Sequence, residues 1–390
     1  MPDFLNTKRA FRLRSSTELK RARLLFRSIG NPSLTRFGSR LALWSLKSGL
    51  PVKGLIKATV FKQFCGGESI DNCTPTIERM YALGVHAILD YSAEGKASEC
   101  DFERTKKITL ETIDYASSHS AVPLTVFKPT GLGRLEIWQA KSDKRELTAA
   151  EEKEWARVRE RVETICAHAA SLKVPVMFDA EESWMQDAAD TLCLEMMRRH
   201  NGENVIIYNT LQMYRHDRLA YLKELNEIAE GEGFKVGLKI VRGAYMEKER
   251  LRAQQKGYPS PIQASKAATD NDYNAACAFI LERIERFALV AGTHNEESSQ
   301  MLAELLSAKG LKKDHPHVFF SQLYGMSDNI SFNLAAEGYN VVKYLPFGPV
   351  EDVMPYLIRR AEENTSVGGQ SGRELQLIEK EISRRKKERA

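Results

Sequence analysis

Polar or charged side chains follow each of eight short apolar runs in this 390-residue sequence. Taken singly, each is explained by a strand that ends at the surface, but eight in succession predict a polar ring around one pocket. Four of them are cations, and converging cations suit an anionic ligand such as a carboxylate or a phosphate. In chain order the residues are Asp90, Lys128, Asp179, Asn209 with Gln212, Lys239 with Arg242, Thr293 with His294 and Asn295, Gln322, and Lys343 with Tyr344.

A turn of small residues follows the fifth run. Gly243 and Ala244 stand between Arg242 and Tyr245. Such a turn lets backbone N–H groups approach a phosphate closely. The other glycine pair, in residues 131–133, is not a dinucleotide-binding fingerprint, because it lacks a third glycine, a helix start and a downstream acid.

Two adjacent arginines, Arg359 and Arg360, lie on a predicted helix over residues 351–364. Glu363 is one turn beyond Arg359, so these two side chains can form an ion pair. Adjacent residues point about 100° apart on a helix, so both guanidinium groups can still reach an anion lying over it. A clamp of this kind would hold the carboxylate of a small amino acid. The alternative is a solvated basic face of the helix.

The elements that carry these residues follow an alternating pattern. The apolar runs are rich in β-forming residues and are separated by helical stretches such as 183–201, 218–231, 271–287 and 297–309. This alternation predicts an α/β fold with a parallel sheet, and eight βα units fit a closed (βα)8 TIM-like barrel. The runs cover residues 87–91, 124–128, 176–179, 205–209, 236–241, 289–293, 318–321 and 341–344. Residues 131–148 are predicted to be an extra loop before a helix over 151–168.

The N-terminal segment is strongly basic. Fourteen Lys and Arg residues stand against Asp3 and Glu18 in the first 64 residues, and two amphipathic helices are predicted over 16–28 and 34–48. This charge suggests peripheral contact with an anionic membrane surface, and the alternatives are a solvated helix face or a mitochondrial transit peptide. Three parts are predicted: a basic helical arm (1–60), the barrel (61–372) and a basic C-terminal tail (373–390).

Composition argues against a metal site, a membrane-spanning helix and a nucleic-acid partner. The six cysteines are scattered without CxxC or zinc-like spacing, so reduced thiols in a cytoplasmic compartment are expected, with no metal site. No apolar run approaches the roughly 18 residues that a membrane-spanning helix requires. No nucleic-acid partner is expected.

Read together, these motifs resemble the proline dehydrogenase family from about Phe64 to Glu363, in the order in which that family has them. The arrangement is similar to the stand-alone, mitochondrial branch, and no aldehyde dehydrogenase module follows. The matching stretches are Phe64–Glu68, Asp179–Glu182, Tyr208–Tyr214, Lys239–Tyr245, Thr293–Asn295, Gln322–Met326, Tyr344–Gly348 and Tyr356–Asn364.

The resemblance implies a distorted (βα)8 barrel that holds FAD without a covalent bond. It implies oxidation of L-proline to 1-pyrroline-5-carboxylate, the first step of proline catabolism, by hydride transfer to the flavin. Family enzymes pass the electrons to a membrane quinone. The expected location is therefore cytoplasmic and peripheral to the inner membrane, with a mitochondrial location as the alternative.

On the substrate side, the resemblance assigns the proline carboxylate to Lys128, Arg359 and Arg360. Tyr344 is expected over the proline ring, with Leu323 opposite. The other expected substrate-side residues are Tyr245, Tyr356 and Glu363, the last as the acid paired with the arginine helix. Asp179 is expected in the pocket and is grouped with Lys239 and Tyr344 as catalytic.

On the flavin side, Gln212 matches a residue that bonds the edge of the isoalloxazine ring. Lys239 matches the cation near the reactive flavin nitrogen. Many bacterial relatives have arginine at that position and lysine at 242. The ammonium group of lysine is a point charge, whereas the guanidinium group of arginine can donate two parallel hydrogen bonds. The remaining cofactor-side residues are Arg242, Gly243, Ala244, Thr293, His294, Asn295 and Gln322.

Three other functions remain open from the sequence. Hydroxyproline dehydrogenase is the nearest, although relatives with that activity tend to carry a smaller residue at the position of Tyr344. A Schiff-base aldolase would use Lys128 or Lys239 as its nucleophile. A barrel that binds a metabolite without catalysis would bind its ligand without reducing a flavin.

Overall fold

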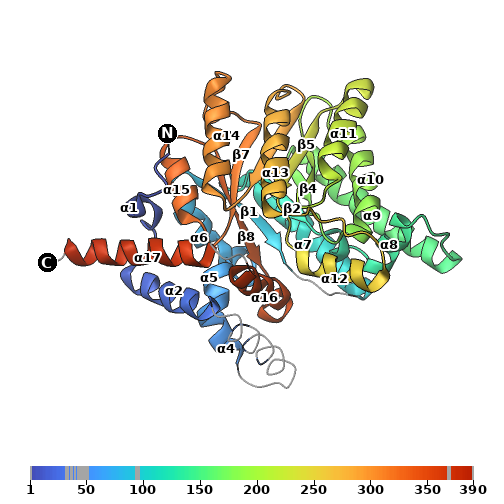
Figure 1. Cartoon of the computed structure of the whole chain (residues 1–390). Helices are drawn as coiled ribbons and strands as arrows, with labels where there is room; N and C mark the ends of the chain where they lie inside the picture. Colours follow the sequence, from blue (N-terminus) through green and yellow to red (C-terminus); the bar gives the residue numbers. More distant parts are fainter. Residues whose placement is uncertain are drawn as a thin grey trace. The chain divides into compact units, whose positions relative to one another are not determined.

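The computed structural model describes residues 2–30, 35, 38, 41, 52–92, 97–366 and 370–388; for 362–366, 370 and 371 it describes the backbone alone. Eight parallel strands form a closed barrel in chain order, with helices between them (Figure 1). The prediction of a (βα)8 TIM-like barrel is therefore confirmed. The strands are β1 (Val85–Tyr91), β2 (Leu124–Phe127), β3 (Val176–Phe178), β4 (Ile207–Gln212), β5 (Val236–Val241), β6 (Phe287–Gly292), β7 (Val318–Leu323) and β8 (Val341–Phe347).

Every predicted run overlaps one of these strands, because strands covered on both faces are rich in apolar residues. The largest shift is at β4, which begins two residues later than predicted and continues through Gln212. The helices around the barrel are α6 (Ile70–Tyr81), α7 (Glu99–Ser118), α8 (Leu135–Ser142), α9 (Ala149–Leu172), α10 (Ser183–His200), α11 (Arg218–Glu232), α12 (Met246–Lys256), α13 (Lys266–Leu281), α14 (Glu296–Ala308), α15 (Asp328–Ala336) and α16 (Val350–Ser366).

The chain divides into two compact units, which are described separately. The first unit comprises residues 1–94, 294–296 and 321–390. The second comprises residues 95–293 and 297–320. The first unit holds β1 and β8, the second holds β2 to β6, and β7 contributes residues to each. The predicted division into an arm, a barrel and a tail stays a prediction.

In the first unit, β1 pairs with β8 along its whole length, from Val85 opposite Val341 to Tyr91 opposite Phe347. A separate hydrophobic core lies where α2 (Ser16–Ile29) packs against α17 (Gln370–Lys387). These two helices run side by side in Figure 1. The α2 side chains in that core recur at helical spacing, which is the pattern that buries one face of a helix. They are Leu19, Ala22, Phe26 and Ile29.

The first predicted arm helix, over 16–28, is confirmed as α2, which begins at Ser16. Its N-cap is Ser15, whose hydroxyl accepts from the N–H of Glu18 while the Glu18 carboxylate accepts from the N–H of Ser15. This reciprocal pair is a capping box. The second predicted arm helix, over 34–48, lies almost entirely outside the described residues.

The predicted tail begins inside α17. Leu377, Ile378 and Ile382 of this helix are buried, and Arg385 donates hydrogen bonds to the carbonyl oxygens of Phe11 and Arg14 at 2.9 and 2.8 Å. The helix is therefore packed against the N-terminal residues rather than frayed in solvent.

In the second unit, the segment predicted as a loop contains the helix α8. Its side chains Ile137 and Trp138 are fully buried, and the helix packs against α10. Two helical turns are too short for an amphipathic period to stand out, especially beside Gly131 and Gly133. Among the described residues, no helix is both long enough and apolar enough to cross a membrane.

Candidate active site

Two lysines share one aspartate at the strand ends of the second unit. Lys128 follows β2, Asp179 follows β3, and Lys239 lies in β5. Nζ of Lys239 donates to Oδ1 of Asp179, and Nζ of Lys128 lies 3.6 Å from Oδ2 of the same carboxylate. Both lysines are buried. The structure therefore brings together three residues that the sequence predicted for one pocket.

Buried ammonium groups require a compensating charge, because desolvating an unpaired ion costs several kcal/mol. One carboxylate carries a single negative charge against two positive charges. Lysine ammonium groups of this kind bind anions such as carboxylates and phosphates.

Glu181, which follows β3, forms hydrogen bonds with residues at the ends of β2 and β4. Its carboxylate accepts from the N–H and the hydroxyl of Thr130 at 2.9 and 2.6 Å, two residues after Lys128. Its backbone carbonyl accepts from Nε2 of Gln212 at 2.7 Å. Burial, and then the nearby Glu182, raises the pKa of Glu181 to about 8. Sequence reasoning included Glu181 in a motif without giving it a role.

Arg242 is held from four sides. Its guanidinium donates to Asp270 at 2.6 Å, to the hydroxyl of Thr293 at 2.6 Å and to the hydroxyl of Ser298 at 2.9 Å. Its Cζ lies 4.4 Å from the centre of the Tyr273 ring. Two predicted cofactor-side residues, Arg242 and Thr293, are thus in direct contact.

The structure explains why residue 243 is glycine, which the sequence alone did not. Its φ is +131°, and a Cβ there would lie 2.5 Å from the ring of Tyr214. Only glycine tolerates both conditions. The close approach is to a protein ring, so the glycine is explained without a phosphate.

Hydrogen bonds join the helix that follows β5 to the start of the helix that follows β3. Tyr245 directly precedes α12, and Glu249 in the first turns of α12 is completely buried. The Glu249 carboxylate accepts from the N–H and the hydroxyl of Ser183, each at 2.6 Å. Ser183 is the first residue of α10, whose own N-cap, Glu182, makes no side-chain cap. Glu249 therefore caps α10 from another helix, which no sequence pattern indicated.

In the first unit, Lys343 does not belong to a ring of cations around one pocket. It is buried, its Nζ lies 2.9 Å from Oδ1 of Asp328 on α15, and it donates to the carbonyl of Met326. Burial lowers the pKa of Lys343. Successive residues of a strand point to opposite faces, so Lys343 and Tyr344 cannot face the same pocket. The prediction for Lys343 was therefore wrong.

The remaining strand-end residues of the first unit are also bonded. Nδ1 of His294 lies 2.8 Å from the hydroxyl of Ser327, and Oε1 of Gln322 accepts from the hydroxyl of Ser331 at 2.8 Å. Leu323 is partly buried against the core that contains Tyr356.

The arginine pair lies on α16, as predicted. Arg360 is buried, with its Cζ 5.2 Å from the centre of the Tyr356 ring, and Arg359 is partly buried. The pair is therefore not a solvated basic face. The side chain of Glu363 lies outside the described residues, so its pairing with Arg359 stays a prediction.

The predicted site residues thus form two sets. The second unit contains Lys128, Asp179, Gln212, Lys239, Arg242, Gly243, Ala244, Tyr245 and Thr293, and the first contains His294, Asn295, Gln322, Leu323, Tyr344, Tyr356, Arg359, Arg360 and Glu363. In the described part of the chain, no group of three or more His, Cys, Asp or Glu could hold a metal ion.

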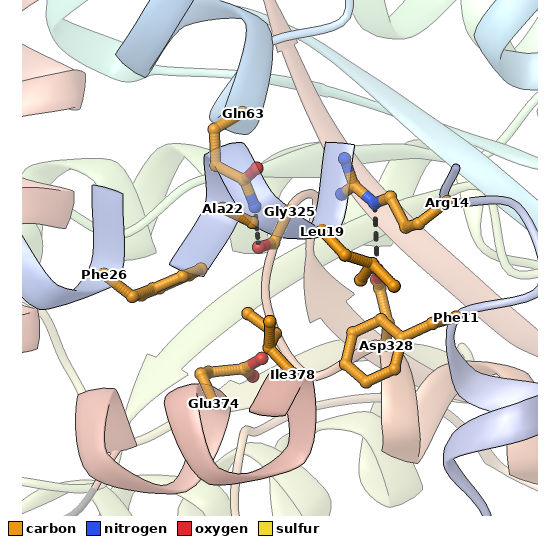
Figure 2. A pocket seen from close by; sticks show the side chains of 10 residues that line it. All are labelled: Phe11, Arg14, Leu19, Ala22, Phe26, Gln63, Gly325, Asp328, Glu374 and Ile378. Carbon is orange, nitrogen blue, oxygen red and sulfur yellow. Dashed lines mark hydrogen bonds and ion pairs between the residues drawn. The ribbon is translucent and has the colours of Figure 1, made fainter. Parts of the chain in front are cut away.

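A pocket also lies in the first unit, and none of these residues lines it (Figure 2). Its empty volume is about 240 Å³, including space open to solvent. Its charged lining residues are Arg14, Asp328 and Glu374, and Arg14 lies 3.5 Å from Asp328. Although burial opposes ionisation, Lys343 and Arg14 hold the pKa of Asp328 below its usual value.

The chain has a closed (βα)8 barrel with buried, paired charged groups at its strand ends, which is where enzymes of the barrel class have their active sites. Residues 73–373 match the family model for proline dehydrogenase. The match covers most of the chain, so the chain belongs to the proline dehydrogenase family and is an oxidoreductase of that type. The predicted family is confirmed.

Relatives that match over most of their own length support this membership. The chain is 36% identical to the carbapenem antibiotics biosynthesis protein CarD of Pectobacterium carotovorum over 93% of this chain and 94% of that protein. It is 32% identical to hydroxyproline dehydrogenase of Xenopus laevis over 96% of this chain and 88% of that protein. It is also 32% identical to mitochondrial proline dehydrogenase 1 of Arabidopsis thaliana over 89% of this chain and 78% of that protein.

A solved structure shares the fold. It is proline utilization A (PutA) from Bdellovibrio bacteriovorus, inactivated by N-propargylglycine, with a TM-score of 0.73 and 22% sequence identity. The likeness covers 90% of this chain and 37% of the PutA chain. The chain therefore spans little more than a third of that longer protein.

Proposed function

We propose that the chain is an FAD-dependent proline dehydrogenase that oxidises L-proline to 1-pyrroline-5-carboxylate and passes the electrons to a membrane quinone. The observation that carries this proposal is the cluster of Lys128, Asp179 and Lys239 at the strand ends of a barrel of this family. Two buried lysines at the strand ends suit the carboxylate of an amino acid. Several relatives are named as proline dehydrogenases, which supports proline as the substrate.

The chemistry of the residues around Arg242 fits a flavin dinucleotide. The Arg242 guanidinium lies within hydrogen-bond distance of the Thr293 hydroxyl and of the Ser298 hydroxyl, and these are groups of the kinds that donate to phosphate oxygens. The residues that would hold FAD are those matched by the resemblance. They are Gln212, Lys239, Arg242, Gly243, Ala244, Thr293, His294, Asn295 and Gln322.

The protein's own part in the reaction is orientation and charge. Lys128, Arg359 and Arg360 would bind the carboxylate, and Tyr344 and Leu323 would hold the ring, with Tyr245 and Tyr356 lining the pocket. When bound, FAD supplies the hydride acceptor. The C–H bond beside the ring nitrogen is not acidic, so no strong general base is required. Lys239 would stabilise the negative charge that grows as hydride is transferred.

The direct test is anaerobic addition of L-proline to the purified protein while its visible flavin absorbance is recorded. Bleaching of a bound flavin by L-proline is the expected result. A protein that purifies without flavin, or a flavin that proline does not bleach, would contradict the proposal.

Hydroxyproline is the second candidate substrate, because a relative that matches over most of its own length is named hydroxyproline dehydrogenase. Tyr344 is buried and bulky, which argues for the unsubstituted ring of proline. We expect kcat/KM for L-proline to exceed that for 4-hydroxyproline. A preference for hydroxyproline would reverse this assignment.

We also propose peripheral contact with an anionic membrane through the basic N-terminal segment. Leu24 on α2 is exposed beside Lys20, Arg21 and Arg27, which suits the interface of an anionic lipid bilayer. Sedimentation with anionic vesicles at low and high salt tests the contact. Absence of binding at low salt would exclude it. This contact, on the cytoplasmic side of the inner membrane or inside a mitochondrion, would bring the enzyme close to its quinone.

A further inference from the structure

The first turns of the C-terminal helix α17 contact two loops of the barrel. Nε and Nη2 of Arg373 donate to the two carboxylate oxygens of Glu296 at 2.8 and 3.0 Å. The neighbouring side chain, Glu374, accepts from the backbone N–H of Ser327, just before α15. The fork-to-fork geometry of the Arg373–Glu296 pair fixes orientation as well as distance.

Both contacts bear on the turn His294–Glu296, which carries two of the proposed cofactor residues. Ser327, the partner of Glu374, bonds the ring of His294 through its hydroxyl at 2.8 Å. Glu296, the partner of Arg373, directly follows Asn295 and also accepts from Nδ2 of Asn329 at 2.9 Å. The turn is therefore held at one end through Ser327 and at the other end through Glu296.

Ser327 is held in a backbone conformation that it would not adopt freely. Its φ is +50°, in the left-handed region that disfavours residues other than glycine. Such strain persists only where surrounding contacts hold it, and it gathers at functional sites. Glu374, which makes one of these contacts, is itself buried.

The position of Glu374 is costly for the fold. The carboxylate lies at the pocket that α2 helps to form, and Asp328 lines the same pocket (Figure 2). Burial, and then the charge of Asp328, raises the pKa of Glu374 to about 7. An apolar side chain would suit this environment better, so the reason for a carboxylate here is its hydrogen bond with the N–H of Ser327. The family match ends at residue 373, so nearly all of α17 lies beyond it.

We propose that Arg373 and Glu374 are positioning residues for the turn His294–Glu296, so that the C-terminal helix forms part of the FAD-binding apparatus. The inference rests on the proposed function, because it takes the ligand of this turn to be FAD. It extends that function to a helix that the resemblance left unassigned.

The test compares FAD retention in four proteins: the wild type, Glu374→Ala, Arg373→Met and the control Glu379→Gln. Glu379 lies on the same helix but pairs with Arg27 of α2, away from the turn. Dilution of each purified holoprotein, followed by the rise in fluorescence of released flavin, measures the FAD dissociation constant. Thermal unfolding with and without added FAD measures the stabilisation that FAD provides.

We expect Glu374→Ala and Arg373→Met to weaken FAD binding about tenfold, the effect of losing one hydrogen bond to a charged group. The rise in Tm produced by added FAD should shrink, and Glu379→Gln should behave as the wild type does. Glu374→Gln keeps a carbonyl oxygen for the Ser327 N–H, so it should restore most of the affinity.

Two results would overturn the inference. One is an unchanged FAD dissociation constant in both disruptive variants, even with a lower Tm, since α17 would then be purely structural. The other is an equal loss of affinity in Glu379→Gln. Arg373 is partly exposed, so Arg373→Met should fold even if Glu374→Ala does not. If the wild type binds no FAD, it is the proposed function that fails, and the two failures are thus distinguishable.

Discussion

Asp179 is the residue on which the proposed chemistry most depends, because it neutralises part of the charge of two buried lysines. Lys239 donates to one of its oxygens, and Lys128 lies 3.6 Å from the other. Removing one partner from such a cluster leaves a buried charge without compensation. The geometry of both lysines therefore depends on the aspartate.

We predict that Asp179→Asn lowers kcat/KM for L-proline by about 10- to 100-fold, because Lys128 and Lys239 then repel each other and move apart. Steady-state kinetics with each variant measures the effect. The matched control is Asp143→Asn, an exposed aspartate at the end of α8, which should leave kcat/KM unchanged. Full activity of Asp179→Asn would show that the cluster has no part in the reaction.

Glu181 should make stability depend on pH. Its pKa is raised from its ordinary value of 4.5 to about 8 in the folded protein, mainly by burial. Between these values the folded state binds a proton that the unfolded state has lost. The stability contributed by the protonated group is therefore complete below the unfolded pKa and declines as pH rises toward the folded pKa.

The expected decline is at most about 1.4 kcal/mol per pH unit within that window. The free energy of unfolding in urea, measured from pH 5 to pH 8, should fall less steeply for Glu181→Gln than for the wild type. Parallel curves for the two proteins would mean that Glu181 is ionised in the fold throughout this range.

At the scale of elements, α12 stabilises the start of α10. The first N–H groups of a helix have no partner within the helix, and a carboxylate can accept from them while its charge is favourable at the positive end of the helix dipole. The capping residue is usually the one that precedes the helix. Here Glu182 is in that place without capping, and Glu249 supplies the carboxylate from 66 residues further along the chain.

We predict that Glu249→Ala lowers the free energy of unfolding by about 1–3 kcal/mol, because two donors of Ser183 lose their acceptor. Glu247→Ala is the control, since Glu247 is an exposed acid in the same helix turn. Its effect should stay within about 0.5 kcal/mol. Equal effects of the two substitutions would reduce Glu249 to an ordinary surface charge.

At the scale of the whole molecule, the two ends of the chain form one hydrophobic core. Leu19 and Phe26 of α2 are buried with Leu377 and Ile378 of α17. The helices are separated by more than 300 residues, so their packing closes the first unit over a long chain distance. Burial of this kind provides most of the stability of paired helices.

Leu19→Ala should therefore destabilise the protein by about 2–5 kcal/mol, because it leaves a cavity in this core. Leu24→Ala is the matched control on the same helix, where the side chain is exposed and the expected change is within about 0.5 kcal/mol. Thermal unfolding of both variants checks the difference. If the two leucine variants melt together, α2 does not anchor the first unit.

The sequence alone determined the barrel, the order of its strands and most of the polar strand ends. Those features depend on local pattern: apolar runs, helical periods and the residue that follows each run. The family followed from motifs read along the chain. The short helix α8 was missed because two turns carry too little periodic signal, and Lys343 was misplaced because neighbouring strand residues face opposite sides.

Only the tertiary structure decided which charges meet. The pairing of Asp179 with two lysines, the capping of α10 by Glu249 and the contact of Glu374 with Ser327 each join residues more than 40 positions apart. No local pattern encodes such contacts, because they follow from how the elements pack rather than from sequence spacing. The basic C-terminal segment, read along the chain, suggested a tail, and burial of its apolar face made it a structural helix.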